Sequence, residues 1–146
     1  MPGNLFPARI FQFDGRVMNR ILVVQDDPVL LGLVSGSLRP EGHEVREIAD
    51  PLEALAFATG EPETIDLLIV RVDSKPISGI ELAKRLALQG VEIPILFLSD
   101  SRALAGVIAT SFGRSAVLEQ PFSGAELRAA ARRCMAGHGR KQKQIA

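Results

Sequence analysis

Short apolar segments alternate with amphipathic ones along most of this chain. Five segments predict strands, and they span residues 21–24, 44–48, 67–72, 95–98 and 116–118. Most of them are continuously apolar, which is typical of parallel strands that helices cover on both faces. The segment at 44–48 instead alternates polar and apolar residues, so we expect it to be a half-exposed edge strand.

Polar residues mark where the intervening helices begin. Two Asp-Pro pairs place a capping carboxylate before a proline at the first helical position, and two Ser-x-x-Glu segments have the spacing of capping boxes. The four starts are Asp27-Pro28, Asp50-Pro51, Ser78-Gly79-Ile80-Glu81 and Ser123-Gly124-Ala125-Glu126. A further helix is expected over residues 103–110. Strands that alternate with helices in this way predict an α/β fold with a doubly wound parallel sheet and five helices.

Composition narrows the class of protein. The chain has 146 residues, 47% hydrophobic and 23% charged, which suits one globular domain. Its 17 basic and 17 acidic residues balance, so charge gives no argument for binding nucleic acid or a membrane. A single cysteine, Cys134, excludes an internal disulfide. No apolar run approaches the roughly 18 residues of a membrane span. We therefore expect a cytoplasmic protein.

The two ends of the chain depart from the regular pattern. Residues 1–18 form an N-terminal extension, residues 19–136 the predicted domain, and residues 137–146 a basic tail that we expect to be flexible. Two interpretations of the extension remain open. In the first, Met18 is the true translation start and the preceding residues are an artefact. In the second, the extension is an ordered arm that packs its phenylalanines on the domain.

Polar residues also follow four of the predicted strands, at the edge where ligands bind in open sheets of this class. Gln25, Asp26 and Asp27 follow the first strand and Arg71, Val72 and Asp73 the third, Ser99 ends the fourth, and Glu119-Gln120-Pro121-Phe122 follows the fifth. This order resembles the receiver domain of bacterial two-component response regulators. The resemblance covers about residues 19–136 and implies a flavodoxin-like sheet with strand order 2-1-3-4-5.

The resemblance also implies a chemistry that this chain lacks in part. Receiver domains hold Mg²⁺ on an acidic pair, phosphorylate an aspartate after the third strand, and use a lysine after the fifth strand to contact the phosphate. A gap-free match over residues 66–82 places Arg71 at the phosphoacceptor position, and a guanidinium cannot attack phosphorus. The other matched positions are Gln25 and Asp26 for the acidic pair, Ser99 for the switch hydroxyl, Val117 for the switch aromatic residue and Gln120 for the lysine.

Arg71 is expected to occupy the pocket rather than point into solvent, and to pair there with Asp26 or Asp27. For Asp27, a role as the helix N-cap is favoured over a role as metal ligand, because Pro28 follows it. Asp26 alone is a weak candidate for Mg²⁺, since its neighbours are uncharged or cationic. We expect no cofactor and no catalytic residue.

The predicted function is therefore that of a stand-alone pseudo-receiver, which is not an enzyme and acts in signal transduction through protein contacts that need no phosphorylation. The fourth helix has a small, uncharged outer side that includes Ala105 and Ala109. In the resembled family, the fourth helix, fifth strand and fifth helix form the usual surface for dimers and partners. We expect a homodimer or an unidentified signalling partner there, with Arg128 and Arg132 on the rim.

Two alternatives remain open. A two-residue slip would make Asp73 the phosphoacceptor of an atypical but active receiver, although the lysine would still be missing. In the other alternative, the modified pocket is a sensor in which Arg71 and Ser99 bind a small anion.

Overall fold

The computed structural model of the protein describes residues 12–13, 16–17, 19–100 and 115–145. Its main feature is a five-stranded sheet in which every neighbouring pair of strands is parallel. The strand order β4-β3-β5-β6-β7 confirms the predicted 2-1-3-4-5 arrangement. The strands are β3 (Arg20–Val24), β4 (Glu44–Ile48), β5 (Leu67–Arg71), β6 (Ile95–Ser99) and β7 (Ser115–Glu119).

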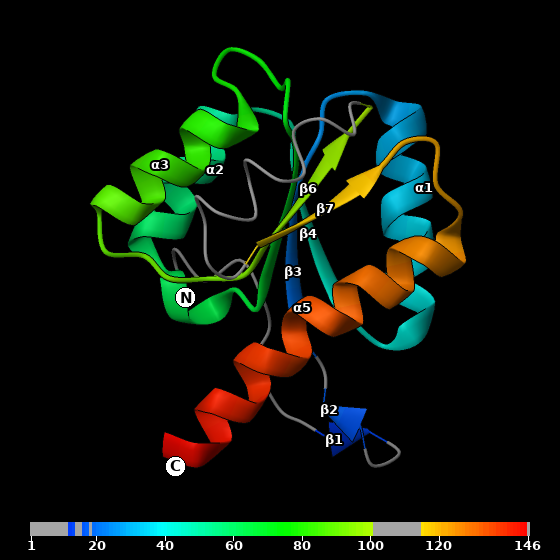
Figure 1. Ribbon diagram of the computed structural model, residues 1–146, viewed down its shortest axis with the longest axis vertical. Coiled ribbons are helices and arrows are strands. Elements are labelled where there is room, and N and C mark those ends of the chain that lie inside the picture. Colours follow the sequence, from blue (N-terminus) through cyan, green and yellow to red (C-terminus); the bar gives the residue numbers. More distant parts are fainter. Residues whose placement is uncertain (1–11, 14–15, 18, 101–114, 146) are drawn as a thin grey trace.

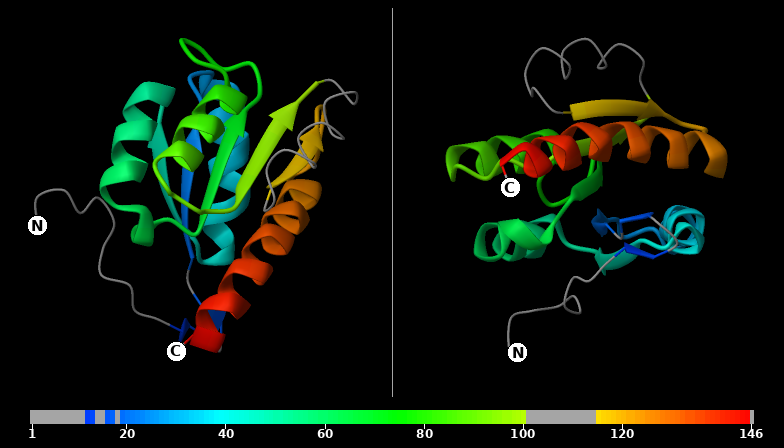
Figure 2. Two further views of the ribbon diagram at one scale, coloured as in Figure 1. Left: turned by 60° about the vertical axis from the view of Figure 1, so that its left-hand side comes forward. Right: turned by 90° about the horizontal axis from the view of Figure 1, so that it is seen from below.

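Helices cover both faces of this sheet, as Figures 1 and 2 show. Helices α1 and α5 lie on one face, and α2 and α3 lie on the other. Their bounds are α1 (Pro28–Leu38), α2 (Pro51–Gly60), α3 (Gly79–Leu88) and α5 (Gly124–Ile145). The 3₁₀ turns η1 (Arg39–Glu41) and η2 (Pro62–Thr64) follow α1 and α2, and β1 (Gln12–Phe13) pairs with β2 (Arg16–Val17) as a separate antiparallel ladder. The predicted helix over 103–110, with Ala105 and Ala109, lies outside the described residues.

The sheet register explains why the central strands are continuously apolar. Successive side chains of a strand point to opposite faces. In β3, Ile21 and Val23 pack in the layer of α1 and α5, whereas Leu22 and Val24 pack in the layer of α2 and α3. All four side chains are buried, so neither face of β3 has a place for a polar residue. The edge strand β4 is only partly buried, as its alternating pattern predicts.

The predicted Asp-Pro helix starts are confirmed. The Asp27 carboxylate (Oδ1) accepts a hydrogen bond of 3.0 Å from the Val29 amide at the start of α1. The Asp50 carboxylate accepts one of 2.9 Å from the Leu52 amide at the start of α2. Each bond satisfies an amide that has no partner within its own helix.

The two predicted capping boxes differ. At α5 the box is reciprocal, because the Ser123 amide donates to Glu126 (2.8 Å) and the Glu126 amide donates to the Ser123 hydroxyl (3.1 Å). At α3 the Ser78 hydroxyl accepts from the Glu81 amide at 3.0 Å. The Glu81 carboxylate, however, bonds Arg85 Nε at 2.9 Å instead of closing the box. A residue one turn further along the helix therefore competes with the cap for the carboxylate.

The basic tail was expected to be flexible, but α5 continues through it to Ile145. Beyond Gly139 the tail consists mostly of Arg, Lys and Gln, which have high helix propensity, and cations suit the negative end of the helix dipole. Among the helices that the structure describes, none combines the length and mean hydropathy that crossing a membrane requires.

The start of α3 lies directly against the end of β5, and a glycine makes this approach feasible. The Gly79 amide donates to the Val72 carbonyl oxygen at 2.9 Å. A Cβ on Gly79 would collide with the Arg71 carbonyl oxygen and lie 3.2 Å from Val70 Cγ1. The backbone of β5 cannot move aside without breaking its pairing with both neighbouring strands.

Replacing this glycine is therefore expected to destabilise the fold. We predict that Gly79→Ala lowers the free energy of unfolding by about 1–3 kcal/mol, as other overpacking substitutions do. Urea denaturation followed by circular dichroism measures the change. Gly60→Ala is the matched control, because a Cβ at the end of α2 meets no atom within 4 Å. Equal stability of the two variants would contradict the proposed steric role of Gly79.

Candidate functional site

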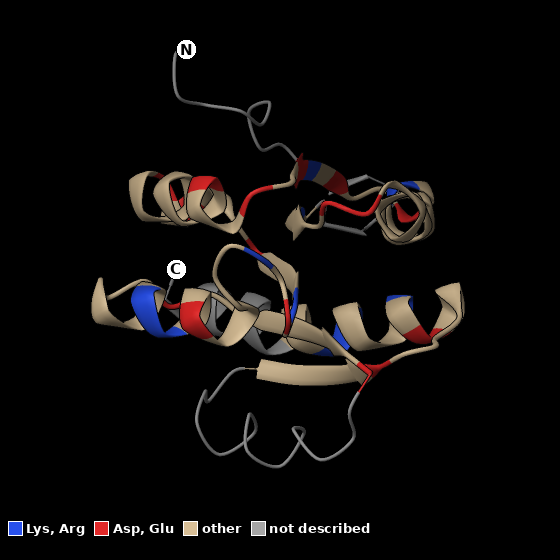
Figure 3. Cartoon of the chain, turned by 90° about the horizontal axis from the view of Figure 1, so that it is seen from above, with Lys and Arg blue, Asp and Glu red and all other residues tan. Residues whose placement is uncertain are grey.

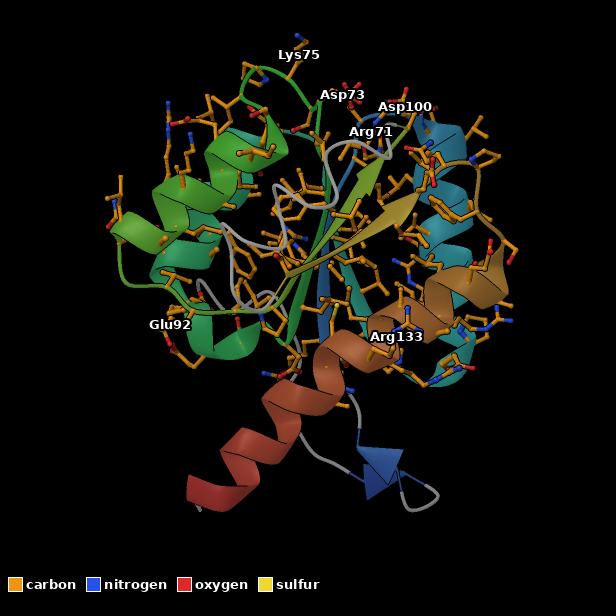
Figure 4. The ribbon with its side chains drawn as sticks, in the orientation of Figure 1. Arg71, Asp73, Lys75, Glu92, Asp100 and Arg133 are labelled. Carbon is orange, nitrogen blue, oxygen red and sulfur yellow. The ribbon has the colours of Figure 1, made fainter. Side chains whose placement is uncertain are left out.

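A cavity of about 150 Å³ opens at the carboxyl ends of β3, β4 and β5. Figure 4 shows three of its residues, Arg71, Asp73 and Lys75, at this edge of the sheet. The cavity is lined by Val24, Gln25, Asp26, Ala49, Arg71, Asp73, Ser74 and Lys75. Four of the predicted pocket residues, Gln25, Asp26, Arg71 and Asp73, thus lie around one cavity.

The predicted ion-pair partner of Arg71 was wrong. The guanidinium bonds Asp73 through two contacts, Nε to Oδ1 at 2.9 Å and Nη2 to Oδ2 at 3.1 Å, and not Asp26 or Asp27. The chain turns at Val72 and Asp73, directly after β5, and this turn places the Asp73 carboxylate beside the guanidinium. Asp27 is unavailable because its carboxylate caps α1.

This ion pair lies at the mouth of the cavity rather than in the core. The Arg71 side chain is 27% exposed and that of Asp73 is 61% exposed. The two parallel contacts are the geometry in which a guanidinium binds a carboxylate most specifically. They place a permanent cation at the end of β5 and hold both oxygens of the adjacent carboxylate.

Gln25 is the most buried polar residue of the cavity wall, with only 4% of its surface exposed. Its Oε1 accepts from the Asp27 amide at 2.9 Å, and its backbone amide donates to the Ile48 carbonyl oxygen at 3.1 Å. These bonds connect the end of β3 to β4 and to the start of α1. The carboxylate of the next residue, Asp26, is exposed and lines the cavity.

Three further predicted positions, Ser99, Val117 and Gln120, do not line the cavity. Ser99 is buried at the end of β6, and its carbonyl oxygen accepts from the Gln120 amide at 2.7 Å. Val117 pairs with Phe97 in the sheet and packs partly buried against the core. The sequence therefore predicted the edge of the sheet correctly, but not which strand ends enclose the cavity.

The sequence analysis did not assign Ala49, Ser74 or Lys75 to the site. Ala49 directly follows β4, so the rule that strand ends meet at one edge could have identified it. Ser74 and Lys75 belong to the loop after β5, whose path the strand pattern does not specify. The Ser74 hydroxyl donates to the Ile77 carbonyl oxygen at 2.9 Å and so holds this loop.

The magnesium ion that the receiver resemblance implies does not fit these residues. Mg²⁺ prefers oxygen ligands arranged as an octahedron, usually with carboxylates among them. Both oxygens of Asp73 are bonded to a guanidinium, and Gln25 replaces a carboxylate with an amide. Within the part of the chain that the structure describes, no three acidic, histidine or cysteine side chains gather where they could hold a metal.

The expected role of Arg128 and Arg132 on the rim of an interaction surface remains a prediction. Arg128 and Arg132 of α5 pair with Glu41 of η1, at 3.8 Å and 2.9 Å respectively. Both arginines therefore point towards η1, which follows α1, and connect two elements on the same face of the sheet.

Cys134 lies on α5, far along the chain from the residues of the cavity. Burial raises the pKa of its thiol, and the nearby Arg133 partly offsets this rise. A raised pKa keeps the thiol protonated at neutral pH, so Cys134 has the properties of a packing residue rather than a nucleophile.

Comparison with known proteins identifies the family to which this chain belongs. The response regulator receiver domain matches residues 21–132, and the chain belongs to this family. Transcriptional regulatory protein TcrA of Mycobacterium tuberculosis is 37% identical over 115 residues, which cover 77% of this chain and 45% of TcrA. The alkaline phosphatase synthesis transcriptional regulatory protein SphR of Synechococcus elongatus is 33% identical over 136 residues, covering 88% of this chain and 52% of SphR. The chain thus spans about half the length of these relatives.

Solved structures agree with this assignment. Chemotaxis response regulator CheY4 of Vibrio cholerae superposes with a TM-score of 0.70 at 29% identity, covering 81% of this chain and 99% of CheY4. NtrX of Brucella abortus superposes with a TM-score of 0.76 at 25% identity, covering 88% of this chain and 30% of the NtrX chain. The protein is thus a receiver domain whose pocket carries Arg71 at the end of β5.

The Arg71–Asp73 pair is expected to contribute little to stability. Asp73 is mostly exposed, and pairs of this kind contribute about 0.2–1 kcal/mol because water and salt screen them. A double-mutant cycle of Arg71→Ala, Asp73→Ala and the double variant, measured by urea denaturation, gives the coupling energy. This coupling energy should decrease at high salt. A salt-insensitive coupling of about 3 kcal/mol or more would instead indicate a desolvated pair.

Proposed function

We propose that this receiver domain is a pseudo-receiver, a binding module in bacterial signal transduction that acts without accepting a phosphoryl group. The observation that carries this proposal is Arg71 at the end of β5, bonded through two contacts to Asp73. Membership of the receiver family supports a role in signalling. The altered pocket residues support the view that this role does not use phosphorylation.

The chemistry of phosphoryl transfer supports the proposal. An attacking carboxylate needs a free oxygen and a cation that neutralises the charge building up on the phosphoryl group. Arg71 has no lone pair with which to attack, and it remains protonated. Gln25 and Gln120 replace the other groups that the receiver resemblance implies, a carboxylate and a lysine.

An active receiver that uses Asp73 is the second candidate, because Asp73 lines the cavity together with Asp26. Two features count against it. Both oxygens of Asp73 are held by Arg71, so attack would first require this ion pair to open. Gly79 also starts α3 at the position that the gap-free match gives it, and this match places Arg71 rather than Asp73 at the acceptor position.

An anion sensor built on Arg71 and Ser99 receives less support from the geometry. The Arg71 Nε and Nη2 groups already bond Asp73, and Ser99 does not line the cavity. The cavity also has two carboxylates, Asp26 and Asp73, facing its two cations, Arg71 and Lys75. An anion entering it would meet no net positive charge.

The output of the domain is proposed to pass through protein contacts in the cytoplasm, with a signalling partner or with a second copy of the chain. Two of the relatives, TcrA and SphR, are transcriptional regulatory proteins, and the matched part of this chain covers 45% of TcrA and 52% of SphR. Our proposal concerns the receiver domain alone. The expectations that it stands alone and uses the face of Ala105 and Ala109 remain predictions.

The direct test is phosphorylation by a small donor. We predict that incubation with acetyl phosphate and Mg²⁺ leaves the intact mass unchanged, because the pocket lacks an available nucleophile. A receiver with a complete acidic pocket serves as the positive control. A phosphoryl adduct that is lost in Asp73→Ala would overturn the pseudo-receiver proposal and establish the second candidate.

Restoring the missing groups should restore the reaction. We predict that the combined variant Arg71→Asp, Gln25→Asp and Gln120→Lys takes up one phosphoryl group in the presence of Mg²⁺. The matched control carries Gln25→Asp and Gln120→Lys with Arg71→Asn, which has the same size but no nucleophile, and it should stay unmodified. If both variants fold and neither reacts, the loss of activity does not result from these three residues.

A further inference from the structure

The outer face of α1 is unusually apolar for a helix at the protein surface. No charged residue occurs between Pro28 and Leu38, and the buried side packs on the sheet and α5. On the outer side, the Val29 side chain is 81% exposed and that of Leu33 is 42% exposed. We define the α1 face by Val29, Gly32, Leu33 and Gly36, which are the exposed residues of the helix after Pro28.

The two glycines of this face are not required by the fold. A Cβ built on Gly32 or Gly36 would meet no atom within 4 Å, in contrast to Gly79. Glycine within a helix costs about 0.5–1 kcal/mol relative to alanine, and nothing inside the chain offsets that cost here. Each glycine leaves a notch in the helix surface next to a large exposed side chain.

The ends of α1 carry opposite charges. Asp26 precedes the helix, and in the part of the chain that the structure describes its exposed carboxylate has no ion-pair partner. Arg39 follows the helix with 52% of its side chain exposed, and its Nη2 contacts Glu47 at 3.2 Å. A second helix that runs antiparallel to α1 would therefore meet opposite charge at both ends.

We propose that the α1 face binds the α1 face of a second copy of this chain, antiparallel about a two-fold axis between Gly32 and Leu33. In this register Val29 lies opposite Gly36 of the second copy, and Leu33 lies opposite Gly32. Each large side chain thus faces a notch. The same axis places Asp26 opposite Arg39 of the second copy, so shape and charge select one register.

The charges at the two helix ends make this register specific. Residues along a helix rise about 1.5 Å each, so one turn of slip moves the helix by about 5.4 Å. A slip of one turn carries Asp26 away from Arg39, and in one of its two directions it also brings Val29 against Leu33 of the second copy. A two-fold contact of this type is isologous, and the assembly closes at two copies.

This inference rests on the proposed function in one respect, because it uses Asp26, which also lines the cavity. With Mg²⁺ excluded and Arg71 bonded to Asp73, the Asp26 carboxylate is available for a contact with the second copy. One short helix pair buries less than the roughly 1,200 Å² of a standard interface. We therefore expect a weak dimer with a Kd on the order of 10–100 µM.

The test is sedimentation of the full chain between about 5 and about 500 µM, a range that brackets the expected Kd. The wild-type chain should shift from monomer to dimer across this range. Gly36→Leu fills the notch and should weaken the dimer by about tenfold or more. The same substitution should leave the melting temperature unchanged or raise it, because leucine is the better helix former. Loss of association therefore cannot be attributed to unfolding.

Two matched substitutions test whether the dimer contact lies on the α1 face. Val29→Glu and Leu88→Glu each replace a strongly exposed apolar side chain, since Leu88 is 87% exposed at the end of α3. Only Val29→Glu should abolish the dimer. Asp26→Lys alone and Arg39→Glu alone should each weaken the dimer, whereas the double variant should restore it because the opposite charges again face one another.

Three outcomes would overturn the inference: a chain that stays monomeric at the highest concentration, a dimer that tolerates Gly36→Leu, or a dimer lost only in Ala105→Glu, which would place the contact on the fourth helix. Sedimentation repeated with Mg²⁺ distinguishes the dimer proposal from the pseudo-receiver proposal. A dimer that responds to Gly36→Leu and is weakened by Mg²⁺ supports the α1 face, but shows that Asp26 binds metal and counts against the proposed function.

Discussion

Parallel pairing of all five strands is the constraint on which the rest of this structure depends. Parallel strands need helices on both faces, so the central strands must be apolar and their polar residues are confined to the strand ends. Figure 3, which views the molecule from above, shows the helices on the two sides of the sheet. Because every strand runs in the same direction, residues as distant in sequence as Gln25 and Arg71 meet at the carboxyl edge. The cavity is thus a consequence of the fold and needs no catalytic residue to form.

This separation between fold and chemistry explains how Arg71 can occupy the end of β5. The neighbouring positions Leu68, Ile69 and Val70 are fully buried and could not accept a charge. Arg71 is the first residue of the strand whose head group reaches solvent, and there Asp73 neutralises it. The steric constraint at this point falls instead on Gly79, whose missing Cβ allows α3 to approach the Arg71 carbonyl oxygen. The residue that the fold requires and the residue that would determine the chemistry lie side by side but are independent.

The sequence predicted the fold well because each signal was local. Asp27 and Asp50 cap their helices as expected, since a cap needs only the backbone of its own helix. The ion pair of Arg71 was predicted less well, because its partner depends on how the loop at Asp73 turns. The prediction of which residues line the cavity was incomplete for a similar reason. Ser99 ends a strand at the correct edge, but whether it borders the cavity depends on side-chain directions that strand order does not specify.

Residues that the fold does not require are where a function can be sought. Gly79 is explained by the backbone beside it, whereas Gly32 and Gly36 have open space around them and lower the stability of their own helix. A polar cavity open to solvent and an exposed apolar helix face are separate features, yet Asp26 belongs to one and adjoins the other. If a metal ion bound there, the charge of Asp26 would be neutralised inside the cavity. In the proposed pseudo-receiver, the bonding of Arg71 to Asp73 therefore also leaves the Asp26 carboxylate available to contact another protein.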